Sequence, residues 1–139
     1  MADRIRLEDE LMRGFHEVFR KIKRDLKEAL GDGRNLGDFA FLRHLYSKGP
    51  QKVSDLSAEF DVTNSHVTQQ TDRLVKKGWV DRERSHMDKR VVELKITKEG
   101  IQVFLEMDER RKAYFKREFN SLSTGELETL LHLFHKLLH

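Results

Sequence analysis

The sequence lacks cysteine, contains a single proline and has no long apolar segment. Without cysteine there can be no disulfide framework, no thiolate metal ligand and no thiol redox sensor. Charged residues are spread through residues 1–13, which argues against a signal peptide. No segment approaches the roughly 18 apolar residues that a membrane-spanning helix requires. We therefore expect a cytoplasmic protein without a membrane partner.

Catalytic signatures are also missing. The sequence contains no phosphate-binding loop, no HExxH motif, no nucleophile elbow and no Cys/His pair. We therefore expect neither an enzyme nor a bound cofactor. His132, His135 and His139 would share one face of a C-terminal helix and could collect Zn²⁺. No acidic partner is obvious beside them, so a polar border next to an apolar stripe is the favoured interpretation, and no metal site is predicted.

Positive charge is concentrated in one part of the chain. The whole sequence carries 27 Lys and Arg against 24 Asp and Glu, a net charge of +3. Residues 63–90 alone carry the same excess, from Arg73, Lys76, Lys77, Arg82, Arg84, Lys89 and Arg90 against Asp72, Asp81, Glu83 and Asp88. A local basic strip favours contact with phosphates. A solvated charged surface is the alternative.

The same segment has the pattern of a helix followed by a hairpin. Small or apolar residues recur at helical spacing, and polar residues occupy the opposite face: Val67, Thr71, Leu74 and Val75 against Ser65, His66, Gln69, Arg73 and Lys76. Thr63 is placed to cap this helix and Gly78 to end it. Two alternating runs follow, at residues 80–84 and 92–96. A polar-faced helix with a basic two-stranded ribbon is typical of a winged helix-turn-helix that binds DNA.

Helical patterns flank this unit on both sides. Apolar spacing predicts a long helix from Leu7 to Leu30, a second from Asn35 to Gly49 and a short third over Val53–Phe60. After the hairpin, Thr97 and Ser123 are placed to cap two more helices. We expect a mainly α fold with a small β-hairpin wing (α+β). It would form a single domain over 1–139, with a DNA-binding lobe at about 35–97 and dimerisation helices at about 5–31 and 98–138.

The end helices carry more large apolar side chains than one small lobe can cover. Burying each such side chain is worth roughly 1.5–3 kcal/mol. Large exposed apolar patches usually mark an interface. These helices could wrap onto their own chain or pair with a second copy, and we favour a homodimer.

The wing region carries a recognisable signature. Asp88-Lys89-Arg90 is followed by Thr97 and then Gly100, and Leu56–Thr63 with Asp72-Arg73-Leu74 through Gly78 fits a helix-turn-helix. Over about residues 10–138 the chain resembles the MarR family of bacterial transcription regulators. The resemblance implies a dimer built from the first and last helices. It also implies a ligand-responsive repressor that binds a pseudopalindromic operator, with recognition helices in the major groove and wings in the minor groove. A two-fold dimer requires half-sites about 34–36 Å apart.

Candidate DNA contacts follow from the helix face and the wing. They are Thr63, Asn64, Ser65, His66, Thr68, Gln69, Gln70, Arg73, Lys76, Arg82, Arg84, His86, Lys89 and Arg90. Glutamine can pair bidentately with adenine, whereas Arg73 and Lys76 would be phosphate contacts or surface charges. The resemblance implies that Arg90 enters the minor groove, where narrow A·T tracts concentrate negative potential. Asp88 would orient that arginine, although an ordinary hairpin ion pair is the alternative.

Two further expectations concern ligands and the rival function. The resemblance implies a small aromatic or anionic effector, for which the candidate pocket is Phe15, His16, Phe19, Phe39, Phe41 and His44. Core packing is the alternative for any one of these residues. The rival function is a winged-helix module that binds RNA or protein without operator specificity. Steep salt dependence would distinguish a DNA-binding protein from a protein-binding module.

Overall fold

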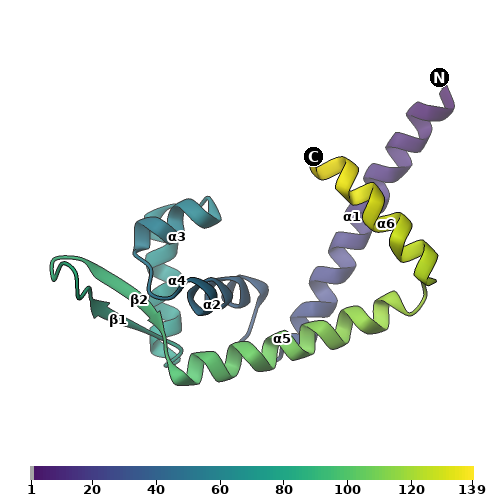
Figure 1. Ribbon diagram of the computed structural model, residues 1–139. Coiled ribbons are helices and arrows are strands. Elements are labelled where there is room, and N and C mark those ends of the chain that lie inside the picture. The colour runs from purple at the N-terminus through teal and green to yellow at the C-terminus, as the bar shows by residue number, and fades with distance from the viewer. Residues whose placement is uncertain (1) are drawn as a thin grey trace.

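A computed structural model describes residues 2–139 and consists of helices with one hairpin. The elements are α1 (Ala2–Leu30), α2 (Leu36–Lys48), α3 (Val53–Phe60), α4 (Asn64–Lys76), β1 (Val80–Arg84), β2 (Val92–Ile96), α5 (Lys98–Phe119) and α6 (Thr124–Leu138). Elements α2 to β2 form a lobe, and α5 runs from the base of the hairpin to α6 (Figure 1). The predicted fold class, mainly α with a β-hairpin wing, is confirmed.

Side-chain caps begin four of the helices, at the residues expected from the sequence. The Oδ1 of Asn35 accepts from the Asp38 N–H at 2.8 Å, and the Thr63 hydroxyl accepts from the His66 N–H at 3.1 Å. The Thr97 hydroxyl accepts from the Gly100 N–H at 2.9 Å. Ser123 and Glu126 form a reciprocal capping box at the start of α6. Each cap satisfies backbone donors that a helix N-terminus leaves free.

One apolar core joins α2, α3, α4, the hairpin and the first half of α5, and the end of α1 reaches it through Leu30. Phe39 stacks on Phe104 with ring centroids 5.4 Å apart, and Phe41 stacks on Phe60 at 6.4 Å. Each buried apolar side chain of this size is worth roughly 1.5–3 kcal/mol. This packing holds α4 on the lobe with its polar face outward.

The hairpin is antiparallel, with Val80 opposite Ile96 and Arg84 opposite Val92. Val80, Leu94 and Ile96 point into the core, while β1 beyond Val80 is exposed. Gln51 extends the sheet by pairing with Leu94 through two backbone hydrogen bonds of 3.0 and 2.7 Å. The hairpin is thus anchored at its base, and its far end projects from the lobe (Figure 1).

A polar cluster joins α1 to α5. Lys21 Nζ lies 2.8 Å from a Glu118 carboxylate oxygen and 3.1 Å from Asp25, and the Tyr114 hydroxyl donates to Asp25 at 3.0 Å. The hydrogen bond from Lys21, followed by that from Tyr114, lowers the pKa of Asp25. Burial and the bond to Asp25 raise the pKa of Tyr114.

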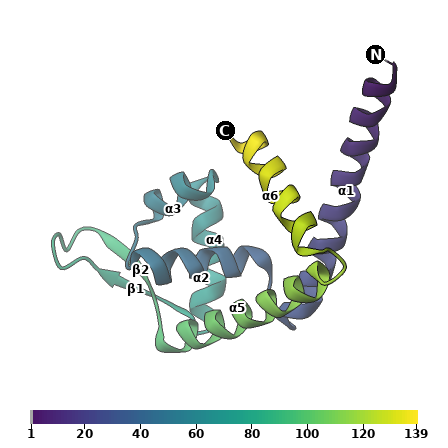
Figure 2. The same ribbon diagram turned by 45° about the vertical axis from the view of Figure 1, so that its right-hand side comes forward.

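Away from this cluster the end helices are largely uncovered. Helix α6 has no buried residue, and the part of α1 before Leu26 has none among its described side chains. Both helices lie toward the end of α5 that is farther from the hairpin (Figure 2). Within residues 2–139, no helix combines the length and apolar character that spanning a membrane would take.

Candidate nucleic-acid interface

Helix α4 presents a polar row to solvent. Its apolar side chains Val67 and Leu74 are buried, together with Thr71, whose hydroxyl donates to the Val67 carbonyl at 2.7 Å. The residues predicted to contact DNA from the first half of the helix are exposed: Thr63, Asn64, Ser65, His66, Thr68 and Gln69. Gln70 is half-buried. The N-terminal half of α4 therefore offers hydrogen-bonding groups on one accessible face.

A hollow of about 350 Å³ separates this face from the start of α2. It is lined by Asn35, Gly37, His66, Gln69, Gln70 and Arg73. The hollow leaves Gln69 and His66 free of packing on that side. The two glutamines and the histidine of α4 therefore share a border with α2.

Arg73 occupies a different environment from the one expected. Its two terminal nitrogens donate to the two carboxylate oxygens of Asp38, at 2.8 and 2.7 Å. This bond raises the pKa of Arg73. The expectation of a phosphate contact or a free surface charge missed this pair, because the partner lies 35 residues away in sequence. The inner edge of the guanidinium is bound to Asp38 of α2, while the side chain stays partly exposed.

Arg82 and Arg84 also make contacts within the chain. Arg82 forms an ion pair with Asp72 of α4, which links the first strand of the hairpin to the helix. Arg84 donates to the Lys89 carbonyl at 2.8 Å and thereby closes the far end of the hairpin. Both side chains remain exposed, so these contacts leave them beside any ligand of α4.

The tip of the hairpin displays Arg90. Its backbone N–H and its Nε donate to Oδ1 of Asp88 at 3.0 and 3.1 Å, and Nη2 donates to Oδ2 at 3.2 Å. The hydrogen bonds from the Arg90 side chain and backbone lower the pKa of Asp88. The contact expected between these residues is therefore present. Although it is paired, the Arg90 side chain is 91% exposed, and the neighbouring His86 and Lys89 are exposed as well.

The six residues of the predicted effector pocket are divided between α1 and α2. Phe39 and Phe41 are buried in the core against Phe104 and Phe60, so their rings face no open cavity. His44 packs edge-on to Phe60, with ring centroids 5.6 Å apart. Phe15, His16 and Phe19 lie on the exposed part of α1. Three of the six residues belong to α2 of the lobe and three to the uncovered part of α1, and an effector pocket lined by all six stays a prediction.

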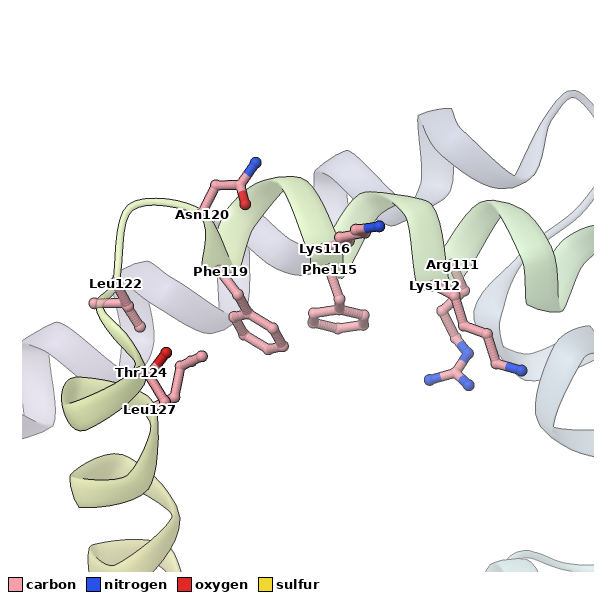
Figure 3. Close-up of a pocket in the computed structure, with 9 residues that line it drawn as sticks. All are labelled: Arg111, Lys112, Phe115, Lys116, Phe119, Asn120, Leu122, Thr124 and Leu127. Carbon is pink, nitrogen blue, oxygen red and sulfur yellow. The ribbon is translucent and has the colours of Figure 1, made fainter.

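A hollow of about 780 Å³ lies at the corner between α5 and α6. Its lining residues are Arg111, Lys112, Phe115, Lys116, Phe119, Asn120, Leu122, Thr124 and Leu127. Phe119 lies nearest Leu127 with Phe115 beside it, while Arg111 and Lys112 stand at the other end (Figure 3). Sequence periodicity placed Phe115 and Phe119 on one face but gave no indication of the bend that forms the hollow.

Metal ligation finds no support in the described residues. Among residues 2–139 no group of three or more His, Cys, Asp or Glu side chains is arranged to hold a metal ion. His132, His135 and His139 lie on the exposed surface of α6 and at its end.

Comparisons with known proteins agree with this geometry. The family model described as MarR family matches residues 35–92. The chain is 36% identical over 121 residues to YpoP, an uncharacterized HTH-type transcriptional regulator of Bacillus subtilis, covering 87% of this chain and 86% of that protein. It is 31% identical to the HTH-type transcriptional repressor MdtR of the same organism, covering 86% and 78%.

A solved structure extends the likeness to three dimensions. A mutant MarR from E. coli, complexed with operator DNA, superimposes with a TM-score of 0.77. The two chains are 29% identical, and the match covers 94% of each. Fold, signature and relatives together show that the chain belongs to the MarR family of transcriptional regulators.

Proposed function

We propose that this regulator is a homodimeric repressor that reads a two-fold operator with α4 and the hairpin wing. One observation carries the proposal: α4 exposes an unbroken run of polar side chains from Asn64 to His66, continued by Thr68 and Gln69, beside a wing with an exposed arginine. A helix of this kind fits the major groove, and an arginine at the end of a ribbon fits a narrow minor groove.

Different residues would have different parts in binding. Gln69, His66 and Ser65 face outward and are the groups that we expect to touch base edges. The remaining polar residues of α4 would contact the DNA backbone or neighbouring bases. They are Thr63 and Asn64 at the helix start, Thr68 and Gln70 within it, and Lys76 near its end. Lys89, His86, Arg84 and Arg82 add positive charge along the wing, which strengthens binding without specifying sequence. Arg90 would enter the minor groove from the tip.

The dimer is supported by what one chain leaves uncovered. Helix α6 buries none of its residues, and α1 exposes Leu7, Leu11, Phe15, Val18 and Phe19. A monomer rarely exposes an apolar surface of this extent. The hollow between α5 and α6 has an apolar end at Phe119 and Leu127 that a helix of a second copy would fill. Pairing through these helices would place two copies of α4 on neighbouring major grooves.

A dimer seated on its operator would block transcription by occupying promoter DNA, and such a protein acts in the cytoplasm of a bacterial cell. An effector site is not part of this proposal, because the six residues expected to form one are dispersed in the chain.

The proposal is tested by measuring affinity at a series of salt concentrations. We would titrate fluorescent 30-base-pair duplex DNA and single-stranded RNA of the same length with the purified protein. The proposal predicts duplex binding with log K falling linearly with log salt, by about 0.9 per phosphate contacted. Equal or tighter binding to the RNA would favour the rival module. Absence of duplex binding in dilute buffer would reject the proposal.

A further inference from the structure

A charged group lies inside the lobe. Asp38, in the first turn of α2, is 0% exposed, and the other buried residues of this helix are apolar. Within residues 2–139, the buried polar or charged side chains are Asp38 and Thr71. Enclosing a carboxylate is unfavourable unless it is paired and hydrogen-bonded. A buried acid therefore calls for a specific partner.

Its partner is the guanidinium of Arg73. Two parallel hydrogen bonds of 2.8 and 2.7 Å join the two groups, each nitrogen to its own oxygen. This bidentate geometry fixes the relative plane and direction of both side chains. Lysine offers a point charge without that fork and would not reproduce it. The Arg73 side chain is 43% exposed, so only its inner edge is enclosed.

Asp38 and Arg73 each lie on a helix at a position fixed by neighbouring contacts. The Asp38 N–H is held by the Asn35 side chain, which caps α2. On α4, Arg73 follows Gln69 by four residues and Gln70 by three, so the three side chains share one face of the helix. All three also line the hollow beside α2, together with Asn35 and Gly37.

Two neighbouring residues of α4 form ion pairs with different elements. Asp72 pairs with Arg82 of the wing, whereas Arg73 pairs with Asp38 of α2. Helix α4 is thereby joined by one ion pair to the hairpin and by another to α2. The tie to α2 is the better defined of the two, because its carboxylate is buried and both oxygens are used.

We infer that Asp38 is a positioning residue for DNA recognition, which acts through Arg73 to set the rotation of α4 about its axis. Turning α4 would move Gln69 and His66 together relative to the groove that they read. The inference rests on the proposed function, because it assumes that α4 reads DNA. It assigns Asp38 no contact with DNA, since the carboxylate is enclosed.

The test compares two variants that alter the pair differently. Asp38→Asn removes the charge but keeps the size, and Arg73→Lys keeps the charge but removes the fork. Asp108→Asn is a matched control, because that carboxylate pairs with Arg111 within α5 and away from α4. For each protein we would measure affinities for the best duplex selected from a random pool and for a scrambled duplex. The salt dependence would be measured too, at a temperature where thermal unfolding shows that the protein is folded.

The expected readout is a loss of discrimination and not of binding in general. Asp38→Asn and Arg73→Lys should each lower the ratio of the two affinities by at least about tenfold, the scale of one misplaced base contact. The double variant should lose no more than the larger single loss, because both changes break one contact. Arg73→Lys should keep the wild-type salt slope, since its charge is unchanged. Asp108→Asn should behave as the wild type.

Three outcomes would overturn the inference. Unchanged discrimination in the folded variants would mean that the pair only stabilises the lobe. A second contrary result is wild-type discrimination in Asp38→Asn and Arg73→Lys together with a reduced salt slope in Arg73→Ala. It would show that Arg73 contacts a DNA phosphate directly. If the wild-type protein itself failed to discriminate the two duplexes, the proposed function would fail and the inference with it. If one single variant does not fold, the other gives the answer.

Discussion

At the scale of single residues, the arginines of the basic segment differ in what they are free to do. Arg73 is fixed to a buried carboxylate, Arg82 is paired with Asp72, and Arg84 closes the hairpin onto the Lys89 carbonyl. Arg90 also has a carboxylate partner, but the pair stands at the exposed end of the wing. The four arginines contribute equally to the net charge, but they differ in the contacts that they make within the chain.

Arg90→Ala should weaken operator binding by about 1.5–3 kcal/mol, the range for one hydrogen-bonded charge. The reason is that its guanidinium is displayed at the wing tip, held in direction by Asp88. A gel-shift titration measures the change. Arg4→Ala serves as the control, because it removes another exposed, carboxylate-paired arginine from α1. Operator affinity equal to that of the wild type in Arg90→Ala would refute the minor-groove role.

Gln69→Ala should relax the base preference at one position in each half-site, by about 1–3 kcal/mol. Its side chain is exposed on α4, in the first half of the helix. Selection from random duplexes with the variant measures the preference at each position. Gln102→Ala removes an exposed glutamine from α5 and should change nothing. An unaltered preference in Gln69→Ala would show that this glutamine does not read a base.

The sequence could predict the exposed face of α4 because helical periodicity separates Val67, Thr71 and Leu74 from the polar side chains. It did not yield the Asp38–Arg73 pair, because a contact between α2 and α4 depends on the packing of both helices. A signal was nonetheless present. Asp38 shares a helix face with Leu42 and Leu45, at spacings of four and seven residues, so an acid stood on an apolar face.

At the scale of elements, the junction between the wing and α5 explains part of the family signature. Thr97 caps α5, donates its hydroxyl to the Gly78 carbonyl at 2.6 Å and receives the Gly100 N–H at 2.9 Å. A β-carbon on Gly100 would lie 2.1 Å from the Trp79 carbonyl oxygen and 2.8 Å from Cγ1 of Ile96. The helix can approach the strands this closely only with glycine at that position.

Gly100→Ala should therefore destabilise the fold by about 1–3 kcal/mol, because backbone must shift to admit the methyl group. Urea unfolding followed by circular dichroism measures the difference. Gly125→Ala is the matched control at the start of α6, where the nearest atom to the added carbon is 3.9 Å away. That change should be neutral or stabilising by up to about 1 kcal/mol. Equal stability of Gly100→Ala and the wild type would contradict the close approach.

The contact between α1 and α5 should depend on pH. The pKa of Asp25 is lowered by its bonds to Lys21 and Tyr114, so the folded state binds this proton less readily than the unfolded state. Its contribution to the free energy of unfolding is thus present above about pH 4 and is lost as the pH falls through the lowered pKa. Asp25→Asn should be less stable than the wild type at pH 7, and the difference should shrink in acid.

Thermal unfolding at a series of pH values would show this convergence. Tyr114→Phe should reduce the difference only in part, because the hydrogen bond from Lys21 to Asp25 remains. Parallel stability curves for Asp25→Asn and the wild type down to pH 3 would show that the cluster adds nothing on folding.

Element starts were predictable because capping is local. Asn35, Thr63, Thr97 and Ser123 each bond a backbone N–H within three residues. The bridge between Gln51 and Leu94 was not predicted, since its partners are distant in sequence and the segment at Gln51 is too short to show alternation.

At the scale of the whole molecule, the sequence indicated most directly that the end helices carry more large apolar side chains than one chain can bury. The large side chains of α1 and α6 were evident from their spacing, and the structure leaves most of them exposed. Where α6 turns from α5, and thus where the hollow beside Phe119 lies, could not be predicted, because the loop at residues 120–123 sets that angle. The burial of Phe39 and Phe41 in the core could not be told from a place in an effector pocket, because an aromatic residue on an amphipathic helix has the same pattern whether it contacts a ligand or a core.

The proposed function requires two copies of α4 held one helical turn of DNA apart. This spacing is tested by selecting binding sites for the wild-type protein from random duplex DNA. We expect a single enriched site with two-fold symmetry and half-site centres about 10 base pairs apart, with A·T-rich flanks where the wings enter. Enrichment of an asymmetric single half-site, or of no sequence at all, would contradict it.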